Sequence, residues 1–206
     1  MLNDLNKTVD ALYRVPRQFY LRHPAMVAPE LLNKLLVRKD GRIGRIVEVE
    51  AYAGNEDAAA HSFRGKTTRN ATMFGRGGHL YVYFSYGMHW CANAVCGAVG
   101  EGHGVLLRAM EPLQGLDLMR QARGHPARDR DLASGPGKLG QAMGMNKSWD
   151  GADLVTGDQG IWIASDGTSP PAVPASGPRI GIRHAADLPW RWHVKESMHV
   201  SKPRPR

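Results

Sequence analysis

The sequence has few of the features that would cross-link a small protein by disulfide bonds, anchor it in a lipid bilayer or direct it to secretion. Only two cysteines occur, Cys91 and Cys96, which are too few for a disulfide framework and do not form a C-x-x-C pair. No apolar run approaches the roughly 20 residues that a membrane-spanning helix needs. The first residues also lack the basic start and apolar core of a secretion signal. We therefore expect an intracellular, cytoplasmic protein.

Several nucleotide-binding and hydrolytic motifs are missing as well. Gly65–Thr67 resembles the end of a phosphate-binding P-loop, but the glycine required at the start of that motif is replaced by Ala60. The glycines at 75–78 and 97–104 do not form a dinucleotide fingerprint between a strand and a helix. No H-E-x-x-H metalloprotease motif and no serine elbow occurs. These classes of enzyme are excluded.

A zinc site is the remaining possibility for a metal. His89, Cys91, Cys96 and His103 could be grouped, but their spacing matches no standard set of zinc ligands. Free cysteines behave as small apolar residues and are often buried. We therefore favour two buried thiols beside a surface histidine, and expect neither a metal nor another cofactor.

Acidic residues are in deficit. The chain has 27 Lys and Arg against 19 Asp and Glu, a net charge of +8 and a pI near 9.8. This balance favours a polyanionic partner, with nucleic acid ahead of a membrane surface, although a generically basic protein is the alternative. With 206 residues the chain is long enough for one domain with a substantial core. We expect that domain at 1–201 and a basic, disordered tail at 202–206.

Alternating and helical hydrophobic patterns indicate the fold class. They predict an α+β protein, a single domain with a curved, mainly antiparallel β-sheet flanked by helices. A hairpin turn is expected at 39–41, a loop at 54–78 with a short helix near 68–74, and a Pro-rich surface loop at 168–178. Strands are predicted at 42–52, 79–86, 88–96, 105–110, 161–163, 180–182 and 190–194, and helices at 3–13, 28–36 and 113–123 and in a segment that ends at 143.

The strand at 42–52 carries the first candidate functional residues. Period-two alternation places Glu48 and Glu50 on one face, and the strand at 79–86 likewise presents Tyr81 and Tyr83 together. A strand carboxylate beside aromatic rings and a basic loop could act as a general base for water. The alternative is a structural glutamate paired with a nearby arginine. Lys138, at the start of the helix that ends at 143, is a plausible phosphate contact.

Several longer sequence strings closely resemble those of alkyladenine (3-methyladenine) DNA glycosylases, and they occur in the same order. The likeness runs from about Phe19 to Ser201, and its motifs are collinear. Two departures occur, because Asn33 stands where the family usually has glycine and His89 where it often has an aromatic residue. The strings that carry the resemblance are Arg45–Tyr52, Asp57–Ser62, Arg69–Asn70, Met73–Phe74, Leu80–Tyr83, Tyr86–Met88, Val105–Leu113, Ser134–Pro136 and Lys138–Leu139.

This resemblance implies a repair enzyme that hydrolyses the N-glycosidic bond of alkylated or deaminated purines flipped out of duplex DNA. It implies no metal, no lysine nucleophile and a monomeric protein. Glu48 is expected to support the site without a catalytic role. The expected roles are water activation by Glu50 with help from Arg108, a base pocket of Tyr52, His61, Tyr83 and Asn93, intercalation by Tyr86, and contacts to the DNA backbone from Arg69 and Lys138.

Two functions from other classes stay open at this point. A non-catalytic module that binds damaged DNA or other nucleic acid could use the same basic and aromatic residues. A hydrolase of nucleosides or RNA could use the same carboxylate, but it would not need Tyr86, because free nucleosides need no flipping. Replacement of Glu50 separates an enzyme from a binding module, and replacement of Tyr86 separates the two enzymes.

Overall fold

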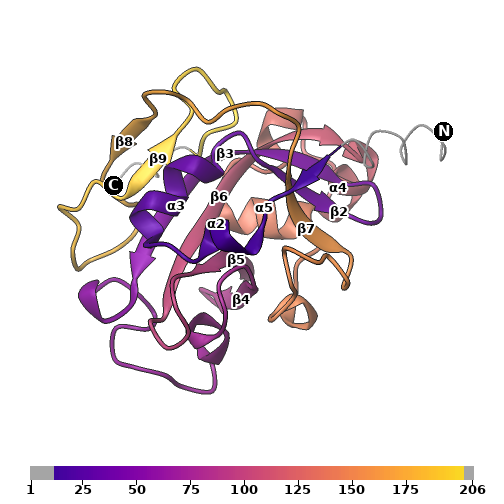
Figure 1. The fold of residues 1–206 in the computed structure, drawn as a ribbon. Coiled ribbons are helices and arrows are strands. Elements are labelled where there is room, and N and C mark those ends of the chain that lie inside the picture. Colours follow the sequence, from indigo (N-terminus) through magenta and orange to yellow (C-terminus); the bar gives the residue numbers. More distant parts are fainter. Residues whose placement is uncertain (1–11, 202–206) are drawn as a thin grey trace.

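A computed structural model describes residues 12–201. These residues form one β-sheet of long and short strands, which is mainly antiparallel and not closed (Figure 1). Its main path runs β1-β7-β2-β3-β6-β5-β4, with β9 paired to β3 and β8 paired to β9. The predicted fold class is therefore confirmed. The strands are β1 Tyr13–Arg14, β2 Leu35–Arg38, β3 Ile43–Ala53, β4 Leu80–Ser85, β5 His89–Cys96, β6 His103–Gln114, β7 Ile161–Ser165, β8 Ala175–Gly177 and β9 Arg191–His193.

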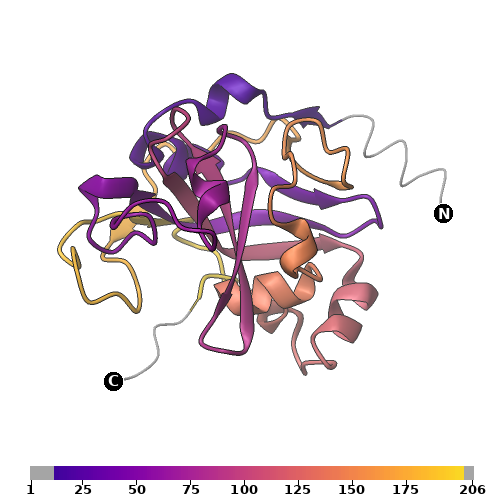
Figure 2. The same cartoon turned by 90° about the horizontal axis from the view of Figure 1, so that it is seen from below.

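Helices cover both faces of the sheet. In Figures 1 and 2, α2 and α3 lie on one face, and α4 and α5 lie on the other. The core between them contains Leu31 of α3, Leu107 of β6 and Leu139 of α5, all fully buried. The helices are α2 Arg17–Tyr20, α3 Pro24–Leu31, α4 Leu116–Ala122 and α5 Pro136–Ala142, with single 3-10 turns at Gly54–Glu56, Ala71–Phe74, Asp129–Asp131 and Lys147–Trp149.

The long strands β3 and β6 form the centre of the sheet. They pair antiparallel from Ile43 opposite Gln114 to Ala53 opposite His103, with register shifts around Glu48. The β2–β3 hairpin closes through Gly41 at the predicted turn, where the Arg38 N–H donates to the Arg42 carbonyl. Because β3 is bordered by β2, β6 and β9, its inward carboxylates lie away from solvent. A strand paired in this way positions functional side chains more precisely than a loop does.

The helix predicted at 28–36 is wrong in its bounds. The observed α3 begins at Pro24, in the first helical position, where a missing N–H costs nothing. Leu35–Arg38 is instead strand β2, which pairs with both β3 and β7. Two sheet partners therefore outweigh the helix propensity of the leucines. Asn33 separates the two elements with a left-handed φ of 66°, a conformation that asparagine tolerates.

The C-terminal region holds the other corrections. No strand forms at 180–182, because the Ile180 N–H donates to the Glu50 carboxylate instead of to a neighbouring strand. The predicted loop at 168–178 ends in a short strand, β8, and β6 is longer than the predicted 105–110. The predicted helix at 113–123 is shortened to α4, because β6 continues to Gln114. The other predicted strands occur within a few residues of the expected bounds, and the short helix near 68–74 is a 3-10 turn.

Two predictions fall on parts of the chain that the structure does not describe. The helix expected at 3–13 lies outside the described residues except at its end, where Tyr13 belongs to β1. The tail expected at 202–206 lies wholly outside them. Within residues 12–201, no helix has the length and apolar character needed to cross a membrane.

Candidate active site

A buried carboxylate on β3 is the centre of the candidate site. Glu50 is fully buried, and its Oε1 accepts the Ile180 N–H at 2.7 Å. Its Oε2 accepts the Tyr52 hydroxyl at 2.8 Å and lies 3.1 Å from Arg108 Nη1. Three donors thus converge on one carboxyl group, which suits an ionised side chain that can only accept. They also hold its two oxygens in a single orientation.

Arg108 of β6 lies between two buried carboxylates. Its Nε donates to Glu48 Oε1 at 3.1 Å, while Nη1 faces Glu50. Burial alone would lower the pKa of Arg108, but Glu50 and Glu48 outweigh it, so the pKa is raised and the guanidinium stays charged. Glu48 also accepts bonds from Arg191 Nη1 at 3.1 Å and from the Ser201 N–H and hydroxyl. Both oxygens of Glu48 thus accept hydrogen bonds from the protein, and one of them holds Arg108. The supporting role expected of Glu48 stays a prediction.

Tyr52 connects Glu50 to a second buried ion pair. Burial and the neighbouring Glu50 raise the pKa of Tyr52 well above its ordinary value, so the phenol keeps its proton and donates it. The guanidinium of Arg179 lies over the Tyr52 ring, with Cζ 4.7 Å from the ring centroid. Arg179 in turn forms a two-bond pair with Asp57, and both side chains are fully buried. One face of Tyr52 is therefore covered by the protein.

Three further aromatic rings lie together, and the shared face predicted for Tyr81 and Tyr83 is confirmed, while their role as a base pocket stays a prediction. Tyr81 and Tyr83 of β4 stack with ring centroids 5.4 Å apart, and the His61 ring meets Tyr83 edge-on at 4.4 Å. Burial raises the pKa of Tyr83, with Cys91 as the next cause, and raises the pKa of Tyr81 to about 12. Both phenols are therefore neutral at physiological pH. Asn93 of β5 is buried beside them, and its Nδ2 donates to the Tyr81 carbonyl at 3.4 Å.

His61 should be neutral at physiological pH. Its pKa is lowered from the ordinary value, first because the ring is partly desolvated against the tyrosines and second because Arg69 is positive nearby. Removal of that charge by Arg69→Gln should raise the pKa of His61, by less than about one pH unit for a partly solvated pair. An NMR titration of the imidazole in both proteins measures this. Arg64→Gln, in the same exposed loop, is the control, and an equal response in both variants would contradict the role of Arg69.

Three predicted DNA contacts lie at the surface. Tyr86 is 83% exposed in the β4–β5 turn and has a φ of 51°. Arg69 is exposed and donates to the Phe84 carbonyl at 2.8 Å, two residues before Tyr86. Lys138 of α5 bonds to Ser134 Oγ at 3.2 Å. A Cβ built on the neighbouring Gly137 would lie 2.6 Å from the ring of His89, so the start of α5 packs closely on the end of the same turn.

Sequence reasoning missed part of this arrangement. Asp57 lies within a string that carries the resemblance, yet no role was assigned to it, and Arg179 was placed in no element. Ser201 and the Ile180 N–H were also not foreseen as partners of Glu48 and Glu50. The sequence carries no local signal for such pairs, because the two partners of each pair lie more than 120 residues apart. Only the three-dimensional contacts identify them.

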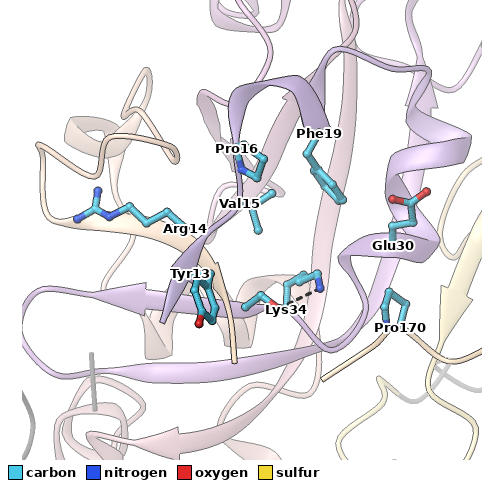
Figure 3. A pocket seen from close by; sticks show the side chains of 9 residues that line it. Tyr13, Arg14, Val15, Pro16, Phe19, Glu30, Lys34 and Pro170 are labelled. Carbon is cyan, nitrogen blue, oxygen red and sulfur yellow. Dashed lines mark hydrogen bonds between the residues drawn. The ribbon is translucent and has the colours of Figure 1, made fainter. Parts of the chain in front are cut away.

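Two surface hollows lie apart from these residues. One, about 310 Å³, lies between β1, α2 and α3 and is lined by Tyr13, Phe19, Glu30 and Lys34 among others (Figure 3). The other includes Asn33 and His199. Neither contains a predicted site residue. Both cysteines are free and buried, as predicted, and within residues 12–201 no three His, Cys, Asp or Glu side chains are grouped to hold a metal ion.

Comparison with known proteins supports the resemblance. The family model described as methylpurine-DNA glycosylase (MPG) matches residues 18–198. A Burkholderia lata protein named "Putative 3-methyladenine DNA glycosylase" is 61% identical over 92% of this chain and 91% of its own. Proteins of the same name from Rhodopseudomonas palustris (48% identical; 92% and 89% covered) and Carboxydothermus hydrogenoformans (46%; 91% and 98%) are also similar. The chain therefore belongs to the methylpurine-DNA glycosylase family.

Proposed function

We propose that this protein releases alkylated or deaminated purines from duplex DNA by hydrolysis of the N-glycosidic bond, with Glu50 as the general base. The observation that carries this proposal is the fully buried Glu50 carboxylate, held by Tyr52, Arg108 and the Ile180 N–H beside a group of aromatic rings. The relatives are named for 3-methyladenine, an alkylated purine, which supports the alkylated part of this substrate class. In this proposal the protein is an intracellular enzyme that acts on DNA as a monomer.

The proposed reaction needs no covalent intermediate with the protein. Water attacks the anomeric carbon of the sugar, the bond to the purine nitrogen breaks, and the base leaves with the bonding electron pair. A cationic alkylated purine leaves as a neutral base, and a neutral deaminated purine takes up a proton from solvent as it leaves. Glu50 accepts the proton that the water loses. Positive charge develops on the sugar in the transition state, and a nearby carboxylate stabilises it. Arg108 holds the carboxylate and helps to position the water on the face of the sugar opposite the leaving base.

Recognition of the base rests on the aromatic group. A flipped purine stacks between the rings of Tyr52, His61 and Tyr83, and an alkylated base that carries positive charge gains from the electron-rich faces of the tyrosines. The tyrosines and His61 are all uncharged at physiological pH, so none of these rings has to gain or lose a proton when the purine stacks on it. Asn93, buried at the edge of this group, discriminates against the exocyclic amino group of normal guanine.

The test of this proposal is base release from a duplex that carries a single hypoxanthine and from methylated DNA. We expect free base and an abasic site to form in parallel, without strand cleavage by the protein itself. Protein that binds these duplexes at the concentrations used and releases no base from either would be a binding module, and the proposal would be wrong.

Replacement of Tyr86 should separate activity on duplex DNA from the chemical step. Glycine relieves the left-handed φ of 51°, so Tyr86→Gly should fold at least as well as the wild type. Without a side chain to fill the space that the flipped nucleotide leaves, release from duplex should fall about tenfold or more, since flipping costs a few kcal/mol. Release from a single strand that carries the same base should fall much less. Val99→Gly, in the exposed β5–β6 turn at the other end of β5, is the control, and equal losses on both substrates would count against intercalation.

A further inference from the structure

We propose that Arg179 and Asp57 act as a positioning pair, which fixes the plane of the Tyr52 ring and directs the Ile180 N–H onto Glu50. The pair touches no substrate in this proposal and acts only through the residues that do. The inference rests on the proposed function for its catalytic meaning, while its structural part can be measured without any turnover.

The burial of this pair is the first observation. Arg179 and Asp57 have no solvent-exposed side-chain surface, although they come from segments 122 residues apart. Arg179 Nη2 donates to Asp57 Oδ1 at 2.8 Å and Nη1 to Oδ2, while Nη1 also reaches the Ala51 carbonyl at 2.8 Å. A buried ion pair stabilises a fold little or not at all relative to apolar residues of the same size. Stability alone therefore gives little reason for it at this place.

Its neighbours supply the reason. The Arg179 guanidinium lies 4.7 Å from the centroid of Tyr52 and 5.5 Å from that of Trp190. Because one face of the Tyr52 ring is covered in this way, the ring cannot turn, and its hydroxyl stays directed at Glu50 Oε2 at 2.8 Å. The covered face is closed to a purine, so only the other face is free to stack. The pair thus orients a pocket wall and a hydrogen bond to the proposed base together.

The backbone next to Arg179 makes the second connection. Ile180 follows Arg179 directly, and its N–H donates to Glu50 Oε1 at 2.7 Å. Ile180 belongs to no strand, and two contacts of its neighbours anchor it: Arg191 Nε donates to the Pro178 carbonyl at 3.0 Å, and the Arg179 side chain pairs with Asp57. Of these two, only the Arg179 side chain is fully buried and belongs to the residue directly before the N–H. Asp57 acts on the other side, because it also accepts the N–H groups of Ala53 and Ala59 in the turn that leads from β3 towards His61. Loss of the pair should release both segments.

A neutral replacement tests the pair without leaving a buried charge. Arg179→Gln combined with Asp57→Asn keeps the approximate size and removes both charges, and Arg45→Gln with Asp166→Asn is the matched control at another two-bond Arg–Asp pair. The ¹H shift and exchange rate of the Ile180 amide are measured by NMR in free protein. Single-turnover base release and affinity for undamaged duplex are measured alongside.

The positioning variant should lose exchange protection at Ile180 and show an upfield amide shift, because its carboxylate acceptor is no longer aligned. Base release should fall about tenfold to a hundredfold, the cost of a misplacement near 1 Å, with affinity for undamaged duplex within about threefold. The control should change neither. If the double variant does not fold, Arg179→Lys, which keeps the charge but loses the planar two-bond geometry, is measured in the same way.

A folded variant with an unchanged Ile180 amide, or with wild-type base release, would overturn the proposal. Failure of the proposed function looks different, because the wild type itself would then release no base. The amide of Ile180 would still decide in that case whether Arg179 and Asp57 position the segment that contacts Glu50. A fall in DNA affinity equal to the fall in release would also overturn the proposal, since it would assign the pair to DNA binding.

Discussion

Glu50→Gln should bind duplex DNA as the wild type does and release base about 10²–10⁴-fold more slowly, the usual contribution of a general base. The amide keeps the size of the side chain, and its oxygen can still accept the Ile180 N–H. It cannot take a proton from water at neutral pH, however, and it brings an N–H₂ group towards Arg108 or Tyr52. The loss should therefore appear in the chemical step of a single-turnover assay, with little change in affinity.

The control for this variant is Glu111→Gln, the same chemical change on β6, three residues beyond Arg108. Glu111 is partly exposed and contacts none of the site residues named above, so base release should be unaffected. A Glu50→Gln protein that retains more than about a tenth of wild-type base release would rule out Glu50 as the base. Its loss would be less than about tenfold, whereas a general base contributes about 10²–10⁴-fold. Binding by both proteins with release by neither would favour the non-catalytic module.

The parts of the site that could be predicted from sequence lie on regular strands. Alternation places Glu48 and Glu50 together, and both carboxylates indeed contact Arg108. The same rule places Tyr81 beside Tyr83, whose rings stack. In each case the geometry is a local property of an extended chain, so a short stretch of sequence is enough to predict it. Residue chemistry alone suggested a general base on this strand and a phosphate contact at Lys138, the family resemblance supplied the other roles, and all of these roles stay predictions.

The parts that could not be predicted depend on contacts between distant segments. Arg179 meets Asp57 across 122 residues of chain, and Glu48 meets Ser201 across 153. Apolar residues at 180–182 favour a strand by pattern, but a hydrogen bond to Glu50 is formed in place of sheet pairing. Leu35 and Leu36 favour continuation of a helix, but pairing with both β3 and β7 outweighs that preference. Non-local contacts of this kind leave no periodic signal in the sequence.

Arg108→Met should destabilise the protein by about 3–5 kcal/mol at pH 7, the usual cost of removing one partner from a buried ion pair. Methionine fills much of the same space, so the loss is electrostatic: Glu48 and Glu50 would remain buried without the cation between them. Urea unfolding at pH 7 measures the free energy. Arg45→Met, which breaks a partly exposed pair with Asp166, is the control and should cost at most about 1 kcal/mol.

A second substitution shows whether repulsion between the two carboxylates is the cause. Glu48→Gln in the Arg108→Met protein removes one of the two like charges and leaves Glu50, so it should restore part of the lost stability. In the wild type the same Glu48→Gln change should destabilise, because Arg108 and Arg191 would lose a charged acceptor. Opposite signs in the two backgrounds are the signature of direct coupling. Two outcomes would contradict this: an equal effect of Glu48→Gln in the wild-type and Arg108→Met proteins, or an Arg108→Met protein as stable as the Arg45→Met protein. Either would mean that Arg108 does not hold the two glutamates together, and its role in positioning Glu50 would have to be abandoned.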